Sequence, residues 1–246
     1  MSISGAGEHG SVTLVTGVSR GIGMAIAREL AKRGHHVVGL ARTQPEAFEG
    51  DFYPVDLADA GATAAVLKEI TRKKRVLRLV NNAGISRIAG AEATTLDDFD
   101  AIMAVNVRSV MQCMQAVLPT MREAKFGRIV NIGSRAALGK DGRLAYGASK
   151  AAVTSMTRTV ALEYAAYGIT ANCIGPGPIE TDMIRKGYPV GSEARTAFTR
   201  QVPVGRFGQP EEIAHACAYF LSEEAGFTTG QVLYVDGGVS VGQALI

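Results

Sequence analysis

The chain has 246 residues, of which 47% are hydrophobic and 20% are charged, and it contains 29 glycines and no tryptophan. This length and composition suit one globular α/β domain with a large aliphatic core and many tight turns. The net charge of +3 is too small and too dispersed to favour nucleic-acid binding.

The cysteines and the N-terminal residues bear on where the protein resides. Cys113, Cys173 and Cys217 are widely spaced and odd in number, so they predict neither a disulfide framework nor a metal site. Residues 1–10 lack the apolar core of a signal peptide, and we expect them to form a flexible tail. We find no apolar run long enough to span a bilayer. The sequence therefore predicts a soluble cytoplasmic protein without a membrane partner.

Strands and helices alternate in the first half of the chain. Short apolar runs predict strands at Ser11–Thr16, His36–Ala41, Asp51–Val55 and Val76–Val80. Apolar residues at helical spacing predict helices at Ile22–Arg33 and Ala60–Thr71. Gly34 is placed to end the first helix in a left-handed conformation. The stretch Thr43–Asp51 is expected to be a loop, which shortens one crossover.

The second half continues this alternation. It predicts helices at Leu96–Arg122, Tyr146–Tyr167 and Pro210–Leu221, and strands at Arg128–Ile132, Ile169–Ile174 and Gln231–Val235. Between them, Thr181–Gln201 is expected to form broken helices or a mobile flap, with Gly187 and Gly191 as hinges. The alternation predicts a single Rossmann-type domain over residues 11–246, with a doubly wound parallel sheet of about seven strands and helices on both faces.

A glycine-rich turn joins the first strand to the first helix. Its sequence is Thr16-Gly17-Val18-Ser19-Arg20-Gly21-Ile22-Gly23. Glycines allow close backbone approach to a pyrophosphate, and the helix N-terminus offers free N–H groups to the anion. An ordinary strand-to-helix turn is the alternative, but three glycines in this context favour dinucleotide binding.

The residue after the second strand bears on which dinucleotide is bound. A carboxylate there would hydrogen-bond the ribose 2′-hydroxyl of NAD, whereas an arginine accommodates the 2′-phosphate of NADP. This chain has Arg42 at that place, and Arg20 in the glycine turn can approach the same phosphate. Two solvated surface arginines are the alternative. We predict NADP(H) as the cofactor.

Tyr146 and Lys150 are the first candidate catalytic pair. Their spacing places both side chains on one face of a helix, about one turn apart. An ammonium beside a tyrosine favours the phenolate, which makes proton exchange near neutral pH feasible. Taken alone, this spacing is more often a solvated helix face than a catalytic pair.

Together with further motifs, these residues resemble the short-chain dehydrogenase/reductase family over almost the whole chain. The further motifs are Asp56, Asn81-Asn82-Ala83-Gly84, Asn106, Ser134 and Gly175-Pro176-Gly177. They occur in the order and near the spacings of that family. Two segments, 178–183 and 202–212, are similar to the 3-oxoacyl-acyl-carrier-protein reductases within it.

The resemblance implies a role for each matching residue. Ser134 would hold the substrate carbonyl, Tyr146 would donate the proton, and Lys150 with a water anchored by Asn106 would replenish it. A buried, satisfied Asn106 and a Ser134 that serves only as a turn residue are the alternatives. The implied cofactor-binding residues are Gly17, Ser19, Arg20, Gly21, Ile22, Gly23, Arg42, Asp56, Asn82, Ala83, Gly84, Tyr146, Lys150, Pro176, Gly177, Ile179 and Thr181. Of these, Asp56 would contact the adenine or only shape a turn.

The implied activity is an NADP(H)-dependent oxidoreductase that interconverts a ketone and a secondary alcohol by hydride transfer. Its first substrate class is a 3-oxoacyl thioester of acyl carrier protein or coenzyme A. No metal is predicted, because the histidines are not at metal-ligand spacings. Alternatives are a cofactor-binding sensor or scaffold, a dehydrogenase of a steroid, sugar or dihydrodiol, and an isomerase or dehydratase using NADP as a transient oxidant.

The sequence indicates less about the binding partners and about the charge of the substrate than about the reaction. The resemblance implies a homotetramer, and the two long helices carry surplus apolar surface. Arg122 and Lys125 could dock an acidic carrier protein, but Tyr167 stands where the carrier-protein reductases have a basic residue. Arg135 and Arg143, between Ser134 and Tyr146, could meet a carboxylate or phosphate on the substrate. Solvated loop charges are the interpretation that the sequence favours for them.

Overall fold

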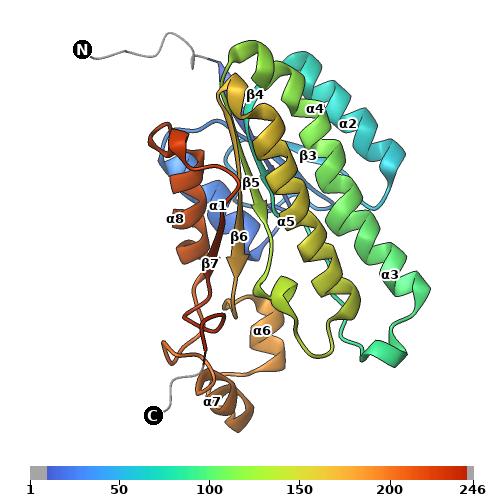
Figure 1. The fold of residues 1–246 in the computed structure, drawn as a ribbon, viewed down its shortest axis with the longest axis vertical. Coiled ribbons are helices and arrows are strands. Elements are labelled where there is room, and N and C mark those ends of the chain that lie inside the picture. The colour runs from blue at the N-terminus through green and yellow to red at the C-terminus, as the bar shows by residue number, and fades with distance from the viewer. Residues whose placement is uncertain (1–9, 243–246) are drawn as a thin grey trace.

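The computed structural model describes residues 10–242, in which seven parallel strands form one sheet with helices on both faces (Figure 1). The expected Rossmann-type, doubly wound sheet is therefore confirmed. The strands follow the order β3-β2-β1-β4-β5-β6-β7. Apart from Gly10, the expected N-terminal tail lies outside the described residues.

The strands are short apolar segments, and those inside the sheet are buried on both faces. Their bounds are β1 Ser11–Thr16, β2 Val37–Ala41, β3 Asp51–Pro54, β4 Arg75–Asn81, β5 Gly127–Ile132, β6 Ile169–Pro176 and β7 Val232–Val235. Every residue of β2, β5 and β6 is buried. Strands of a parallel sheet covered on both sides have this continuous apolar character rather than an alternating one.

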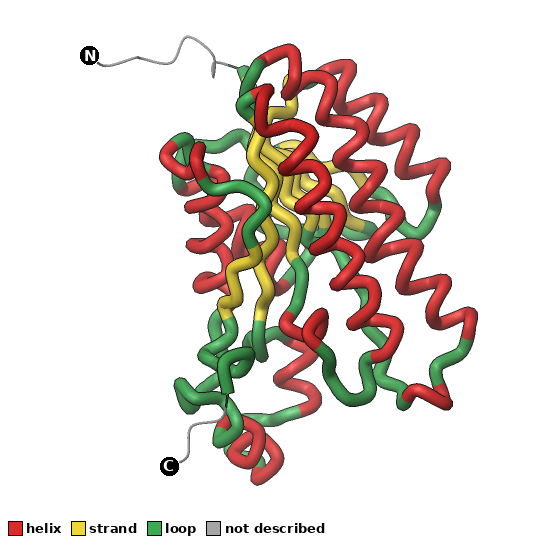
Figure 2. Tube along the Cα trace, in the orientation of Figure 1, coloured by secondary structure: helices red, strands yellow, loops and turns green. Residues whose placement is uncertain are grey.

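The helices form one layer on each face of the sheet. They are α1 Gly21–Lys32, α2 Ala60–Lys73, α3 Leu96–Met103, α4 Ser109–Ala124, α5 Leu144–Tyr164, α6 Asp182–Gly187, α7 Glu193–Thr199 and α8 Pro210–Leu221. One apolar core lies under α2, α4 and α5, and a second lies under α1 and α8. Figure 2 shows the strands between these two helical layers.

The strand order reverses between β1 and β4, whose neighbours run outward in opposite directions. In such sheets, ligands bind beyond the carboxyl ends of the strands at the point of reversal. These ends lie at the lower edge in Figure 1, where α6 and α7 also gather. The fold therefore places the candidate site at this edge.

The long helix expected over Leu96–Arg122 is present and runs from Leu96 to Ala124, but its regular period is interrupted by a turn that the sequence did not predict. The segment is α3, then a π-helical turn at Ala104–Arg108, then α4. A π-turn inserts about one extra residue per turn, and such turns are frequent at functional sites. Elsewhere the expected bounds differ by a few residues, because helix and strand ends follow local capping that periodicity does not reveal. The helix expected from Tyr146, for example, begins at Leu144.

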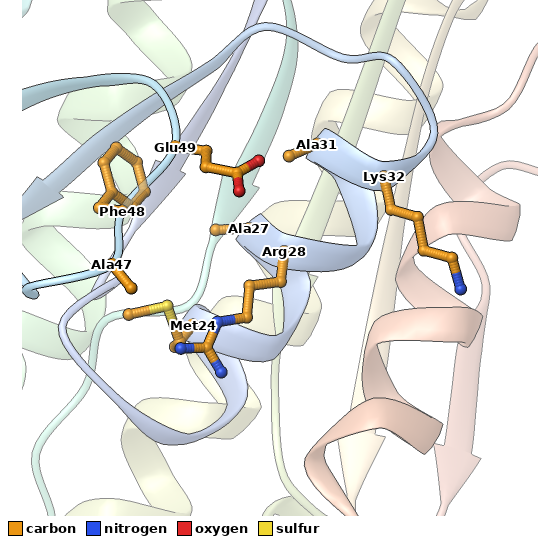
Figure 3. Close-up of a pocket in the computed structure, with 8 residues that line it drawn as sticks. All are labelled: Met24, Ala27, Arg28, Ala31, Lys32, Ala47, Phe48 and Glu49. Carbon is orange, nitrogen blue, oxygen red and sulfur yellow. The ribbon is translucent and has the colours of Figure 1, made fainter.

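The expected loop between β2 and β3 is confirmed, since residues 43–50 form neither helix nor strand. Phe48 of this loop covers the sheet where a crossover helix is missing. A methyl group at Gly39 in β2 would lie 2.5 Å from the Phe48 ring, so glycine is required for this contact. The loop and α1 border a cavity of about 260 Å³, with Phe48 across from Met24 and Arg28 (Figure 3).

One helical segment does meet the length and composition of a membrane span, contrary to expectation. It is Leu96–Ala124, whose most apolar 18-residue window has a mean hydropathy of 1.3. In the fold, 44% of this window is buried inside the protein. Its residues Val110, Val117 and Met121 belong to the core beneath α2, α4 and α5. A core helix passes the same test, so the finding is weak evidence for a membrane span.

The first turn of α8 is stabilised by Glu212. Its carboxylate accepts the backbone N–H of Gln209 at 2.7 Å and pairs with both terminal nitrogens of Arg206 at 2.8 Å. Hydrogen bonding from Arg206 and then from Gln209 lowers the pKa of Glu212 from 4.5 to about 2. The carboxylate form is thus favoured in the folded protein more than in the unfolded chain.

We expect Glu212→Gln to lower the free energy of unfolding by about 1 kcal/mol at pH 7, the usual size of a cap contribution. A carboxyl group whose pKa is lower in the folded state stabilises the protein at pH values above its unfolded pKa of about 4.3. This stabilisation is lost as the pH falls toward 2. Denaturant unfolding should therefore show the difference from wild type shrinking over that pH range. Glu211→Gln, in the same turn, is the matched control and should change stability less at pH 7. Equal losses in both variants would contradict this role for Glu212.

Candidate active site

The glycine turn after β1 is held tightly against the next strand. Gly17 and Gly21 have φ of +74° and +57°, which favours glycine at both positions. A methyl group at Gly23 would lie 2.2 Å from the Gly17 carbonyl oxygen. The Asn82 side-chain amide donates to the carbonyl oxygens of Thr16 at 3.0 Å and Gly17 at 3.2 Å. Asn82 thus fixes the turn rather than standing free beside it.

The N-terminus of α1 is suited to bind an anion. No side chain caps this helix, and its first turn holds no acidic residue. Its free N–H groups and the positive end of the helix dipole therefore remain available to a pyrophosphate. Thr181 lies beside this turn, because a methyl group at Gly21 would be 3.5 Å from the Thr181 methyl carbon. The glycine turn and helix N-terminus fit a dinucleotide on this geometry.

Thr16 contributes to this site, although the sequence assigned it no role. Its hydroxyl oxygen accepts the backbone N–H groups of Asn82 and Ala83, both at 3.0 Å. These contacts join the carboxyl ends of β1 and β4 at the point where the strand order reverses. Because the partners are 66 and 67 residues away in sequence, no local pattern indicates them.

Arg20 and Arg42 lie at the carboxyl ends of neighbouring elements. β1 and β2 pair in parallel with Thr16 opposite Leu40, and the Gly17 N–H donates to the Leu40 carbonyl at 2.6 Å. Both arginines are exposed, and neither forms an ion pair within residues 10–242. Asp56 is also exposed at this edge, and one of its oxygens accepts the Ala58 N–H at 3.0 Å. It therefore shapes the turn, and its second oxygen remains available.

Asn106 lies in the π-turn and is fully buried. Its side-chain oxygen accepts the Ile85 N–H at 2.8 Å, and its amide donates to the Ile85 carbonyl at 2.9 Å and to the Ser149 hydroxyl at 3.0 Å. Ser149 in turn donates to the Tyr146 carbonyl at 2.7 Å. Asn106 thus clamps the segment after β4 to the first turns of α5. No role was predicted for Ile85 or Ser149, since their contacts with Asn106 depend on tertiary structure.

Lys150 is buried beside this clamp. Its ammonium donates to the Ile132 carbonyl at 2.7 Å and lies 5.8 Å from the centre of the Tyr146 ring. A methyl group at Gly84 would lie 3.5 Å from the Lys150 ammonium nitrogen and 3.2 Å from the Asn106 side-chain oxygen. The two residues four apart on α5 therefore share one face, as their spacing predicts.

Ser134 lies in the turn that packs against the start of α5. It precedes a 3-10 helix at Arg135–Leu138, and its hydroxyl oxygen accepts the Ala136 N–H at 3.1 Å. This bond uses only the oxygen, so the hydroxyl proton remains available to a substrate oxygen. A methyl group at Gly147 would lie 2.9 Å from the Ala136 carbonyl oxygen. Glycine beside Tyr146 therefore lets α5 approach the turn that carries Ser134.

The segment after β6 completes this edge of the sheet. Gly177 packs so closely on β7 that a methyl group there would lie 2.5 Å from the Asp236 Cα. Ile179 is buried and its segment bridges to Gly208. Pro176 ends β6, and Thr181 reaches the glycine turn as described above. The predicted residues of this segment thus lie together, between the glycine turn and β7.

A lid of two short helices, α6 and α7, follows this segment, as the broken helical pattern predicts. Glu180 is buried at its base and is paired with Arg195 of α7 and with Arg185 of α6. The hydrogen bond from Arg195 holds the pKa of Glu180 below its usual value. Phe198 and Phe207 stack with ring centres 5.2 Å apart. These contacts attach the lid to the rest of the protein.

We expect Gly84→Ala to lower kcat by about tenfold, a loss of transition-state stabilisation of about 1.4 kcal/mol. The added methyl group would lie 3.2 Å from the Asn106 side-chain oxygen, so it would displace Asn106 by a few tenths of an ångström. Initial-rate kinetics and thermal unfolding should show a larger effect on activity than on stability. Gly90→Ala, where a methyl group meets no atom within 4 Å, is the control and should retain kcat. If Gly84→Ala has the same kcat as wild type, the close packing of Gly84 against Asn106 and Lys150 is not needed for activity.

The residues suggested for carrier docking lie away from this site. Lys125 precedes β5 and Gly168 precedes β6, so both lie at the amino ends of the strands. A methyl group at Gly168 would lie 2.4 Å from the Lys125 carbonyl oxygen, which places Lys125 and Tyr167 side by side. The structure therefore does not bring Lys125 and Tyr167 together with Tyr146 in the same chain.

The described part of the chain holds no group of three or more histidine, cysteine or acidic side chains that could bind a metal ion. The cysteines are all buried and free. Burial raises the pKa of the Cys113 thiol to about 12 and also raises those of Cys173 and Cys217. None is therefore suited to act as a thiolate nucleophile.

Comparison with known proteins agrees with this geometry. Residues 17–240 match the family model described as Enoyl-(Acyl carrier protein) reductase. The 3-oxoacyl-[acyl-carrier-protein] reductase of Vibrio cholerae is 41% identical over 241 residues, which cover 94% of this chain and 98% of that protein.

Two solved structures have the same fold over nearly their full length. The aldohexose dehydrogenase of Thermoplasma acidophilum superposes with a TM-score of 0.89 at 33% identity, covering 96% of each chain. A 3-oxoacyl (acyl-carrier-protein) reductase of Agrobacterium tumefaciens with NADP bound superposes with a TM-score of 0.87 at 32% identity, covering 93% of each chain.

Proposed function

The chain belongs to the short-chain dehydrogenase/reductase family and is an oxidoreductase, and on this premise we propose that it reduces a 3-oxoacyl thioester with NADPH at the site described above. The observation that carries the proposal is the convergence of four residues. Asn106 is joined through Ser149 to the backbone of Tyr146, Lys150 lies under the Tyr146 ring, and Gly147 brings the Ser134 turn against the same helix.

Each of these residues has a chemical role in ketone reduction. Ser134 and Tyr146 donate hydrogen bonds to the carbonyl oxygen and stabilise the charge that develops as it becomes an alkoxide. Tyr146 then transfers its proton to that oxygen. The Lys150 ammonium favours the phenolate that remains. Asn106 is a positioning residue, because its side chain is occupied by Ile85 and Ser149. Oxidation of the alcohol uses the same groups in reverse.

The cofactor would be held by the glycine turn, the start of α1 and the segment after β6. When bound, NADPH supplies the hydride. The uncapped N-terminus of α1 would take the pyrophosphate, and Arg20 and Arg42 would take the 2′-phosphate. Lys150 would also bind the nicotinamide ribose. The bound NADP of the Agrobacterium reductase supports this choice of cofactor.

The thioester class is supported by the Vibrio relative, which covers nearly the whole chain. Aldohexose dehydrogenase activity in the Thermoplasma relative keeps a sugar substrate as the second candidate. We also propose a cytoplasmic homotetramer, in line with exposed apolar residues such as Met111, Leu162 and Phe227 on its helices and turns. A monomer in light scattering would contradict the tetramer.

The test of the proposed function is the loss of NADPH absorbance with acetoacetyl-CoA and NADPH and, in parallel, the gain of NADPH absorbance with an aldohexose and NADP⁺. We expect acetoacetyl-CoA to give kcat of at least about 1 s⁻¹, within the usual range of enzymes. Reaction with the aldohexose alone would favour the second candidate. No turnover with any ketone or alcohol, together with tight NADPH binding, would instead support a sensor or scaffold.

A further inference from the structure

Three cationic side chains lie within the eleven-residue segment that joins the candidate catalytic serine to the tyrosine. Arg135 begins the 3-10 helix directly after Ser134, and Arg143 is the residue before α5, three positions before Tyr146. Lys140 lies between them. Arg135 and Arg143 are half-buried, unlike a side chain that is merely solvated at a loop tip. This segment of three cations therefore borders the place where the carbonyl would be held.

Arg143 is held by the segment that follows β4. It donates to the Ser86 hydroxyl oxygen at 2.6 Å, and the neighbouring Gly142 carbonyl accepts the Ala89 N–H at 3.2 Å. The segment is therefore joined to the chain that follows β4. A guanidinium has five N–H donors, so most of those on Arg143 remain available to a ligand. Its planar arrangement of donors matches a carboxylate or a phosphate.

The three cations lack compensating anions within the protein. None of them forms an ion pair within residues 10–242, even though Asp141 lies in the same segment. Desolvation and then repulsion from Arg135 and Arg143 lower the pKa of Lys140. The Lys140 ammonium also lies 5.8 Å from the centre of the Phe198 ring in the lid. Lys140 thus lies between this segment and the lid, and an incoming anion would relieve its repulsion from Arg135 and Arg143.

An acidic carrier protein is the other anionic partner to consider. A carrier docks on exposed surface, whereas only Lys140 of the three cations is exposed, Arg135 and Arg143 are half-buried, and Arg143 is bonded to Ser86. The position therefore favours a small anionic group that enters the site with the ketone.

We propose that Arg135, Lys140 and Arg143 bind the carboxylate or phosphate of a small ketone substrate at the entrance of this site. The inference rests on the ketone reduction proposed above and adds a substrate class to the thioesters, namely small ketones that carry an anionic group. It favours keto acids and keto phosphates over neutral ketones.

The test compares pairs of related ketones of which one carries an anionic group and the other is neutral. With NADPH, 4-oxopentanoate is compared with its methyl ester, and dihydroxyacetone phosphate with dihydroxyacetone. We expect kcat/KM to be at least tenfold higher for one anionic ketone than for its neutral partner. The pair with the larger ratio shows whether the site binds a carboxylate or a phosphate. Arg135→Gln, Lys140→Gln and Arg143→Gln should each reduce this ratio at least threefold, with the largest loss for Arg143→Gln.

Arg87→Gln is the matched control. Arg87 lies next to Ser86, but its charge is already paired with Asp98 at 3.0 Å. This variant removes the same charge and should retain the ratio. The inference is overturned if anionic and neutral ketones react alike in wild type, or if Arg87→Gln reduces the ratio as much as Arg143→Gln. It is also overturned if the variants slow the reduction of acetoacetyl-acyl carrier protein and leave the reduction of the small anionic ketones unchanged.

A binding measurement separates this inference from the proposed function. If no ketone is reduced, the proposed function fails, and calorimetric titration of 4-oxopentanoate and of dihydroxyacetone phosphate into the protein with NADP⁺ decides the inference. Binding of either anion that is weakened at least tenfold in Arg143→Gln and retained in Arg87→Gln supports the anion site. Equal binding in the two variants, or no binding to wild type, overturns it.

Discussion

Tyr146→Phe should lower kcat by about 10²- to 10⁴-fold, the usual contribution of a general acid or base, while the protein still binds NADPH. The substitution removes only the phenolic oxygen, which is the proton donor in the proposed reduction. The ring that lies 5.8 Å from the Lys150 ammonium is kept, so the packing of α5 should be unchanged. The loss should therefore be in the chemical step rather than in folding.

The measurement is single-turnover reduction of acetoacetyl-CoA by NADPH, with NADPH binding followed separately by fluorescence. Tyr164→Phe is the matched control. It removes the same hydroxyl on the same helix, 18 residues or about 27 Å farther along, where the ring contacts Tyr167. That variant should retain kcat. If Tyr146→Phe reduces the ketone as fast as wild type, Tyr146 is not the proton donor.

Arg42→Asp should lower the NADPH-to-NADH ratio of kcat/KM by about 10²-fold. A hydrogen bond to a charged group contributes about 1.5–3 kcal/mol, which is about 10- to 100-fold in affinity, and the new carboxylate also repels the 2′-phosphate. The same carboxylate can accept a hydrogen bond from the 2′-hydroxyl of NADH. Arg42 is exposed and follows the end of β2, so its replacement should leave the sheet intact.

Steady-state kinetics with each cofactor measures this change. Arg28→Asp makes the same charge change on α1, eight residues or about 12 Å along the helix from Arg20. It should leave the ratio within about threefold of wild type, since it is too far from the helix N-terminus to contact the phosphate. An unchanged ratio in Arg42→Asp would show that Arg42 does not bind the 2′-phosphate.

Much of the fold could be predicted because its signals are local. The apolar runs of β1, β5 and β6 and the helical spacing in α1 and α8 depend on residues a few positions apart. The loop over residues 43–50 was predicted for the same reason, since too few residues separate β2 from β3 for a helix. The strand order was not predicted, because the rules for connections in parallel sheets limit the possible orders without selecting one.

The π-turn was missed because its cause is not local. Asn106 breaks the apolar stripe of the long helix, and this was the one visible signal. What satisfies it is the backbone of Ile85, 21 residues away, and Ser149, 43 residues away. Helical periodicity contains no information on such a contact. The alternative of a buried, satisfied asparagine is thus what the side chain shows, in a position that also supports α5.

The candidate site shows a similar division. Tyr146 and Lys150 were proposed from residue type and spacing, and Ser134 from the family resemblance. The residues that hold them were not, because Thr16 and Gly147 act through long-range contacts with Asn82 and Ala136. For the cations near the site, the sequence favoured solvated charges, and the half-buried Arg143 and its bond to Ser86 are the observations on which we propose a binding role instead.

The most direct test of the central claim is where a transferred deuteride appears. The protein is incubated with NADPH deuterated at the transferring position of C4, together with acetoacetyl-CoA or with trans-2-butenoyl-CoA, and the products are analysed by mass spectrometry. Our account predicts 3-hydroxybutyryl-CoA with deuterium on the carbinol carbon and no reduction of the butenoyl thioester. Deuterium in butanoyl-CoA, with no alcohol formed from the ketone, would contradict it and would indicate reduction of a carbon–carbon double bond.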